Sequence, residues 1–326
     1  MFGRNNPNTA ALPGSNTAPV TSSEVMERLA VDYMKDRKWR RIFKFSLLGV
    51  FLVYFFSIII VAGKSGDASL STAKPHTALI DLSGVIVANG EISADQTNRS
   101  LRKAFEAKNS KGIVLRINSP GGSPVQSDQI NAEITRLRAQ YPDKPLHVVA
   151  TDVCASGCYY IAAAADNIYA NPSSIIGSIG VRMDSFGFVD AIEKLGVERR
   201  SLTAGDNKSI LDPFLPVKPE QQEHAKNMLN IVHQQFISKV KQGRGERLGD
   251  NSDLFSGLFW SGEQAKELGL VDEYGSAEFV AKEVIGAEML VDYTFRPDFL
   301  EKFAKDFGVS VGTGIANVLG GQLSLR

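Results

Sequence analysis

Ser156 is the residue of this chain that is best placed to act as a nucleophile. It lies in the small-residue stretch 154–158 (Cys-Ala-Ser-Gly-Cys), after an apolar run at 145–150 that is typical of a buried strand and before an alanine-rich, helix-forming segment. A hydroxyl at such a strand-to-helix turn can project from the edge of a sheet, and the Gly157 amide can point toward the group attacked. The alternative is that Ser156 only caps the helix, as serine commonly does.

A serine hydroxyl is a weak nucleophile without a base within hydrogen-bond reach, and four histidines are candidates for that base. His147 lies in the strand that leads to the turn, so we expect it to point away along the sheet. His76 stands at the edge of a linker, and His224 and His233 lie on a long helix among glutamines and glutamates. None has an aspartate at a suggestive spacing, but a Ser-His-Asp triad can form from distant positions.

Lys208 is a second kind of candidate base. It stands in a loop over 204–214 that begins with small and polar residues, Ala-Gly-Asp-Asn. A lysine can act as a general base where burial lowers its pKa. The alternative is an ordinary solvated lysine, since lysine is rarely buried.

Composition excludes some other classes of function. The chain has 326 residues, with 36 basic and 36 acidic side chains and a formal net charge of zero, so a nucleic-acid surface is not indicated. Its two cysteines, Cys154 and Cys158, lack the further ligands of a zinc site. Because their spacing is that of one helical turn, we expect two free, buried thiols and no disulfide.

Strands and helices alternate along the globular part, which predicts a mostly parallel sheet with its sites at the carboxyl ends of strands. Both 119–122 and 154–157 fall at such ends. We expect strands at 77–82 with a continuation over 84–87, 112–118, 145–150 and 198–202, and helices at 97–107, 124–138, 188–195 and 219–240. A further helix is capped by Ser261 and ended by Gly269.

The N-terminal part predicts a membrane anchor. Residues 1–44 form a leader, disordered by composition up to about residue 22, and residues 45–63 carry no charge. Nineteen helical residues span about 28 Å, enough to cross a hydrocarbon core. Basic residues crowd just before the apolar stretch, which predicts a cytoplasmic N-terminus and an exported catalytic domain. Residues 64–75 are typical of a linker, 76–296 form the expected protease domain and 297–326 a C-terminal tail.

Several segments, in order, resemble the signal peptide peptidase A family of membrane-anchored serine proteases, relatives of the Clp protease and crotonase superfamily. They are 118–123, 155–162, 176–181, Lys208 and 262–272. The resemblance implies an α/β fold of repeated β-β-α units, preceded by one transmembrane helix. It implies a Ser-Lys dyad of Ser156 and Lys208, with Ser178 orienting the lysine amine and Gly121, Gly122 and Gly157 forming the oxyanion hole.

The resemblance implies the single-protease-domain branch, with two departures. Cys158 stands where family members often carry a second glycine, and the leader before the apolar stretch is long. By resemblance, the substrates are cleaved signal peptides and other apolar peptides associated with the membrane, and no metal or cofactor is needed. The protein is then expected in the bacterial inner membrane, anchored in the bilayer through 45–63, with its catalytic domain on the extracytoplasmic side.

The branch also implies a homo-oligomeric ring in which the Ser of one subunit meets the Lys of its neighbour. Two rival functions are a non-catalytic, membrane-tethered binding or scaffold module of the crotonase type, and an acyl-CoA-using crotonase. The intact Ser156 and Lys208 argue against the first. The predicted export argues against the second, because CoA is cytoplasmic.

Overall fold

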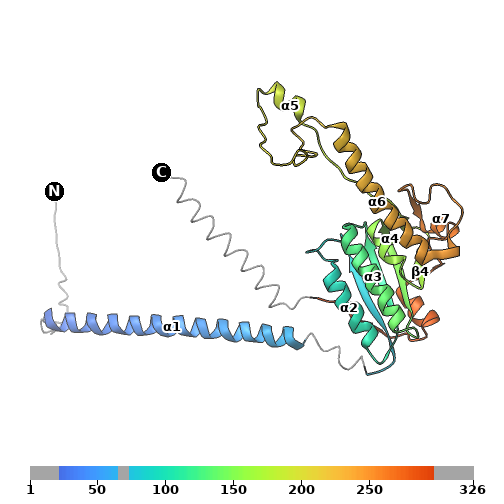
Figure 1. Ribbon diagram of the computed structural model, residues 1–326. Coiled ribbons are helices and arrows are strands. Elements are labelled where there is room, and N and C mark those ends of the chain that lie inside the picture. The colour runs from blue at the N-terminus through green and yellow to red at the C-terminus, as the bar shows by residue number, and fades with distance from the viewer. Residues whose placement is uncertain (1–21, 65–72, 297–326) are drawn as a thin grey trace, which may run out of the picture. The chain divides into compact units, whose positions relative to one another are not determined.

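The computed structural model describes residues 22–64 and 73–296, and the chain divides into two compact units, 1–67 and 68–326. In the first unit, α1 (Ser22–Lys64) is one continuous helix of 43 residues (Figure 1). None of the helices in the two described ranges is long and apolar enough to qualify as a membrane span. The expected span over 45–63 therefore stays a prediction, and the expected disorder of 1–21 and the tail 297–326 lie outside the described residues.

The second unit is built on one sheet whose three long strands are almost entirely buried. These are β1 (His76–Ser83), β2 (Ser110–Ser119) and β3 (Leu146–Ala155). The sheet order is β6-β5-β3-β2-β1-β8, and β4 and β7 branch from β3. All pairs are parallel except β5 with β6. The short strands are β4 (Asn167–Ala170), β5 (Ile175–Gly177), β6 (Phe259–Ser261), β7 (Glu273–Tyr274) and β8 (Leu290–Asp292).

β3 changes its partner along its length. His147 to Ala150 pair with β4, whereas Val153 to Ala155 pair with β5. The sheet therefore divides near Thr151, and β5 lies beside the last residues of β3, just before Ser156. This split positions the end of β5 next to the candidate nucleophile.

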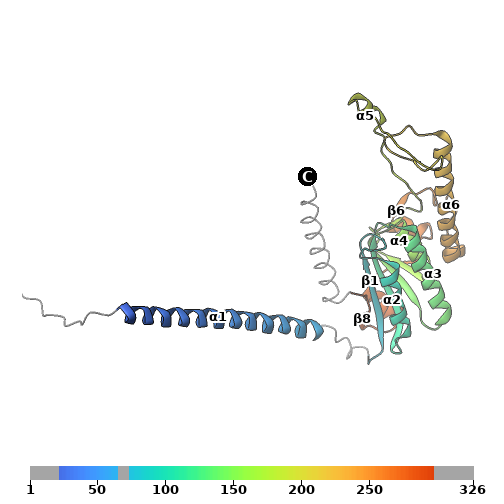
Figure 2. The same ribbon diagram turned by 60° about the vertical axis from the view of Figure 1, so that its left-hand side comes forward.

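Three helices cover one face of the sheet: α2 (Ala94–Glu106), α3 (Pro124–Gln140) and α4 (Gly157–Ala162) (Figures 1 and 2). Apolar side chains of β2 point alternately to the two faces of the sheet, and both faces are buried. Ile113, Leu115 and Ile117 join the large core on one side, and Val114 joins a smaller cluster with Val149, which also includes residues of α8 (Ala277–Phe279) and the π-helical turn Val280–Val284.

The last helices follow the sequence pattern closely. α7 (Gly262–Glu267) begins with the expected capping box, in which the Ser261 hydroxyl accepts from the Gln264 amide and the Gln264 side chain accepts from the Ser261 amide. Gly269 ends this turn with a φ of +72°. α6 (Pro219–Arg244) runs four residues beyond its expected end and continues into the short 3₁₀ turn Gly245–Arg247.

Two expected strands are wrong. Residues 84–87 do not continue β1, because Gly84 adopts a φ of +110° and turns the chain, leaving only isolated bridges at Ile86. Residues 198–202 form no strand, and Leu202 is fully exposed. A strand needs a partner for its backbone groups, and 198–202 have none within the described part of this chain.

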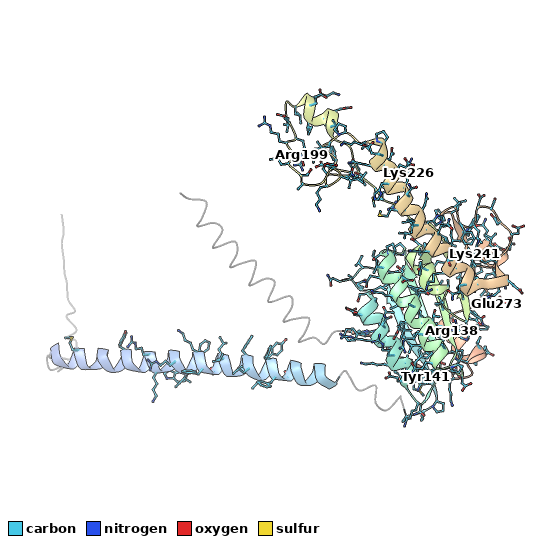
Figure 3. The ribbon with its side chains drawn as sticks, in the orientation of Figure 1. Arg138, Tyr141, Arg199, Lys226, Lys241 and Glu273 are labelled. Carbon is cyan, nitrogen blue, oxygen red and sulfur yellow. A yellow bond between two sulfur atoms is a disulfide. The ribbon has the colours of Figure 1, made fainter. Side chains whose placement is uncertain are left out.

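Most of residues 182–218, which we call the arm, lies at the far end of α6 from α4 (Figures 1 and 2). The arm includes α5 (Val189–Lys194) and is otherwise irregular. Figure 3 shows Arg199 on the arm and Lys241 where α6 meets the rest of the unit. Only the second half of α6 is packed against the core, through Phe236, Val240 and Arg244.

Arg244 secures the end of α6 through a buried ion pair. Its side chain is 1% exposed, and its guanidinium donates to both Asp272 carboxylate oxygens at 2.7 and 2.8 Å and to the Gly269 carbonyl at 2.9 Å. The Ile168 amide also donates to Asp272. Burial alone would raise the pKa of the Asp272 carboxyl, but these hydrogen bonds and the charges of Arg244 and Arg247 outweigh it and lower that pKa.

Arg244→Ala should therefore lower the free energy of unfolding by about 3–5 kcal/mol, because it leaves the Asp272 carboxylate partly buried and unpaired. Urea unfolding of the full-length chain measures this loss. Since the folded-state pKa of Asp272 is below its unfolded value, the contribution of the pair should be present at neutral pH and fade as the pH falls through the acid range.

The matched control is Arg296→Ala, which removes an exposed pair with Asp292 and should cost less than about 1 kcal/mol. Similar losses in the two variants would contradict the structural role of the Arg244 pair.

Candidate active site

A cleft of about 660 Å³ opens at the carboxyl ends of the strands, and Ser156 lies in its wall. Segments far apart in the sequence meet there: the loop after β1, the glycine loop after β2, the turn after β3, the residues after β5 and one face of α6. Five residues that the sequence marked line it together: Gly121, Gly122, Ser156, Gly157 and Ser178.

Ser156 adopts a φ of +54°, which is uncommon for a residue with a side chain. Its amide donates to the Gly177 carbonyl at 2.8 Å, and its carbonyl accepts from the Tyr160 amide. Its hydroxyl makes no capping bond to α4. The alternative that Ser156 is only a helix cap is therefore not supported, and the hydroxyl is available to the cleft.

Two backbone amides face the space beside this hydroxyl. The Gly121 carbonyl accepts from the Ile86 amide and the Ser123 amide donates to the Ile86 carbonyl, so the Gly122 N–H between them points to the other side of the strand. Within the described residues, neither the Gly122 nor the Gly157 N–H has a hydrogen-bond partner. A Cβ atom on Gly157 would lie 3.3 Å from the Gly122 nitrogen, so the two amides are near neighbours.

Gly121 does not offer a free amide to the cleft. Its N–H donates to the Ser119 hydroxyl at 3.1 Å, so its amide is already used. A Cβ atom on Gly121 would lie 2.7 Å from the Gly157 nitrogen and 2.8 Å from the Ser156 Cβ. Glycine is required here for clearance. Of the three glycines expected in an oxyanion hole, the geometry leaves the amides of Gly122 and Gly157 available.

Ser119 and Ser127 were missed by sequence reasoning. Ser119 is fully buried and fixes the glycine loop, as described above. Ser127 is also buried and donates to the Ser123 carbonyl, and its hydroxyl oxygen would lie 2.5 Å from a Cβ on Gly157. A serine two residues before a tight glycine turn is a usable signal for the first of these.

Ser178 lines the cleft from the residue that follows β5. It also has a positive φ, +49°, and its amide donates to the Leu258 carbonyl at 2.8 Å. The backbone is therefore fixed at two neighbouring positions of the cleft lining, Ser156 and Ser178. The hydroxyl of Ser178 is half-buried and makes no hydrogen bond among the described residues.

No general base lines the described cleft. Its titratable lining residues are Tyr160 and Arg182. Arg182 cannot lose its proton in a protein. Burial, and then the hydrogen bond to the Asp128 carboxylate, raise the pKa of Tyr160 above its ordinary value.

The four histidines are also placed elsewhere. His147 is buried in β3 against Tyr169, where burial lowers its pKa, and His76 bonds to Tyr293. His224 is exposed, and the His233 ring bonds to the Ile179 carbonyl without lining the cleft.

Lys208 does not reach the cleft within one chain. It is exposed on the arm, next to Asn207, which accepts a hydrogen bond from Gln221 at the start of α6. Val232, the first α6 residue that lines the cleft, lies eleven residues after Gln221, which is about 16 Å at the helical rise. A lysine side chain cannot bridge that separation.

The expectation of two free thiols is wrong: Cys154 and Cys158 form a disulfide, with Cα atoms 5.1 Å apart. The expectation assumed one helical turn between them. Instead, Cys154 belongs to β3 and Cys158 to α4, and the positive φ of Ser156 folds the chain back between them.

Comparisons with known proteins identify relatives of this chain among peptidases. The profile of Peptidase family S49 matches residues 138–288. A putative protease of Methanocaldococcus jannaschii is 34% identical over 65% of this chain and 69% of its own length. A putative signal peptide peptidase SppA of Enterococcus faecium is 30% identical over 66% of this chain and 64% of its own. Among solved structures, a mutant of ClpP1 from Listeria monocytogenes covers 61% of this chain and 91% of its own, at 18% identity and a TM-score of 0.39.

A protein of Brucella melitensis named Na(+)/H(+) antiporter NhaA is 48% identical over 60% of this chain, but that match covers 27% of the Brucella protein. The chain therefore spans about a quarter of the length of that relative, and the name belongs to the full-length Brucella protein. The S49 profile and the protease from Methanocaldococcus, matched over more than two thirds of its length, show that this chain belongs to peptidase family S49, the signal peptide peptidase A family.

Proposed function

We propose that this protein is a serine endopeptidase in which Ser156 is the nucleophile and Lys208, supplied by a second copy of the chain, is the general base. One observation carries the proposal. The cleft contains a free hydroxyl and two unpaired amides, but no base lines it among the described residues. The candidate lysine is exposed on an arm that projects from the same unit.

In the proposed reaction, the neutral amine of Lys208 takes the Ser156 proton as the hydroxyl oxygen attacks a peptide carbonyl. The Gly122 and Gly157 amides then stabilise the oxyanion of the tetrahedral intermediate. Lys208 returns the proton to the leaving amine, and water cleaves the acyl-enzyme. Ser178, which lines the same cleft, is proposed to accept a hydrogen bond from the incoming amine and to orient it.

The arm supports a shared site because it exposes apolar side chains. They are Met183, Phe186, Phe188, Leu195, Val197, Leu202, Phe214 and Val217. Three of its phenylalanines stack on one another, with ring centroids 6.2 and 5.5 Å apart, which gives the arm a small core of its own. Exposed apolar side chains concentrated in one segment favour an interaction site. Repeated head-to-tail contacts between copies close into a ring when the rotation allows it.

The proposed substrates are cleaved signal peptides and other apolar peptides near a membrane. Apolar side chains form much of the cleft wall, including Val85, Val181, Val232 and Phe236. The uncharged stretch 45–63 is proposed to anchor the protein in the bacterial inner membrane, with the catalytic unit outside the cytoplasm. A non-catalytic scaffold is the alternative, and the labelling experiment below separates the two.

Ser156→Ala and Lys208→Ala should each reduce peptide turnover by about 10³-fold or more, and the double variant should be hardly worse, because residues that act as one unit are not additive. Steady-state assay of the full-length chain on apolar peptides measures this. Lys226→Ala is the matched control, since Lys226 is another exposed lysine, on α6, and should keep nearly full activity (Figure 3).

A loss of only a few-fold in Lys208→Ala would assign the base to another residue. Wild-type protein that neither cleaves peptides nor reacts at Ser156 with a serine-directed phosphonate would favour the scaffold.

Mixing the two inactive single variants should restore activity if the dyad is shared between copies. In a random equal mixture, about one interface in four joins an intact Ser156 to an intact Lys208, so activity should return to about a quarter of wild type. The measurement is turnover after subunit exchange, with exchange followed by a fluorescent label on each variant. Complete exchange without any return of activity would place both residues of the dyad in one subunit.

A reporter that is active only outside the cytoplasm should be active when it is fused after Arg326, because basic residues crowd before the apolar stretch. The same reporter fused after Lys44 should be silent. A silent C-terminal fusion that is expressed at a normal level would refute the proposed topology.

A further inference from the structure

We propose that the Cys154–Cys158 disulfide is a positioning device that holds Ser156 and the Gly157 amide in the geometry of attack, so that activity depends on its oxidation state. This inference rests on the proposed function. The two cysteines lie on either side of the nucleophile, and the loop that they close contains only Ala155, Ser156 and Gly157.

Each end of the disulfide is firmly held. Cys154 pairs with Ser119 of β2 on one side and with Ile176 of β5 on the other. Cys158 is fully buried in the main core, in the first turn of α4. The bond therefore ties the end of the strand to the start of the helix across the turn.

The turn is one that would otherwise relax. Ser156 has a φ of +54°, which a residue with a side chain adopts only when its surroundings hold it there. Gly157 follows, and glycine adds freedom of its own. Relaxation of Ser156 toward an ordinary φ would move its hydroxyl and rotate the Gly157 N–H away from the Gly122 amide. The disulfide opposes both movements.

The two sulfurs do not take part in the chemistry. Both cysteines are fully buried and neither lines the described cleft, so a substrate does not touch them. Their effect is on position alone. A soluble dithiol reaches them only when the turn opens. One thiolate of the dithiol then attacks a cysteine sulfur, which forms a mixed disulfide and releases the other cysteine as a thiolate. The second thiol of the reagent attacks the mixed disulfide and releases the remaining cysteine thiolate, so the products are a cyclic disulfide and two cysteine thiols, with two protons conserved overall.

The chain contains no other cysteine, so a change in activity caused by a thiol reductant can be assigned to this disulfide. The test compares Cys154→Ala, Cys158→Ala and the double variant in the full-length protein. Each of the three variants removes the same disulfide bond. We therefore expect kcat to fall by about 10- to 100-fold in all three, with KM nearly unchanged. Losses that add from the single variants to the double variant would indicate simple packing and overturn the positioning role.

Two further readouts sharpen the experiment. Prolonged treatment with dithiothreitol should lower the activity of wild type and leave the double variant unchanged. The rate at which a serine-directed phosphonate labels Ser156 should fall in parallel with kcat. Alkylation of unfolded, unreduced protein should leave both cysteines unmodified, and modification of both would overturn the inference.

The outcomes separate this inference from the proposed function. Wild-type protein that labels at Ser156 but cleaves no peptide would refute the peptidase, whereas equal labelling of wild type and double variant would refute the positioning role. Wild-type protein that does not label at all would overturn both.

Discussion

The site depends on one backbone constraint, the positive φ of Ser156 between β3 and α4. Such a conformation costs on the order of 1–3 kcal/mol and persists only where neighbours enforce it. The Gly177 carbonyl accepts the Ser156 amide, the disulfide closes the turn, and the Gly121 backbone packs directly against it. The same turn frees the Gly157 N–H and directs the hydroxyl into the cleft. The glycines of the preceding loop are needed because no side chain would fit so close to it.

The division of the sheet at β3 explains how the cleft forms. If β3 paired with a single strand along its whole length, its last residues would lie beside that same strand, and β5 would have no place next to Ser156. Here β4 pairs with the first half of β3 and β5 with the second, so β5 ends beside Ser156 and Ser178 lines the same cleft. Ser119, at the end of β2, fixes the glycine loop between them. The cleft therefore lies at the carboxyl ends of parallel strands, as is usual for sites in such sheets, and its residues follow directly after β2, β3 and β5.

The nucleophile and the proposed base are held by parts of the unit with different surroundings. Ser156 lies between the fully buried core residues Cys154 and Cys158, whereas Lys208 belongs to an arm whose apolar side chains are exposed in a single copy. Under the proposed assembly, an unassembled chain holds its hydroxyl without a base and is inactive. Association would then cover the apolar arm and complete the dyad in one step, which links peptidase activity to assembly.

The sequence by itself determined the features that depend on neighbours along the chain. The buried strands β1 to β3, the amphipathic helices, the capping box at Ser261 and the strand-to-helix turn at Ser156 all follow from local periodicity and turn chemistry. The alternation of strands and helices predicted that the Gly122 and Gly157 segments lie at the same edge of the sheet, whereas their role as an oxyanion hole was predicted only through the family resemblance. Only the tertiary structure decided which glycine amides remain free, that Ser119 uses the amide of Gly121, and that Cys154 and Cys158 are close enough to bond. It also decided that 198–202 pair with no strand among residues 22–64 and 73–296, and that Lys208 lies far from the cleft of its own chain. These outcomes depend on contacts between segments distant in sequence, or on a single φ angle, and neither leaves a periodic signal in the order of the residues.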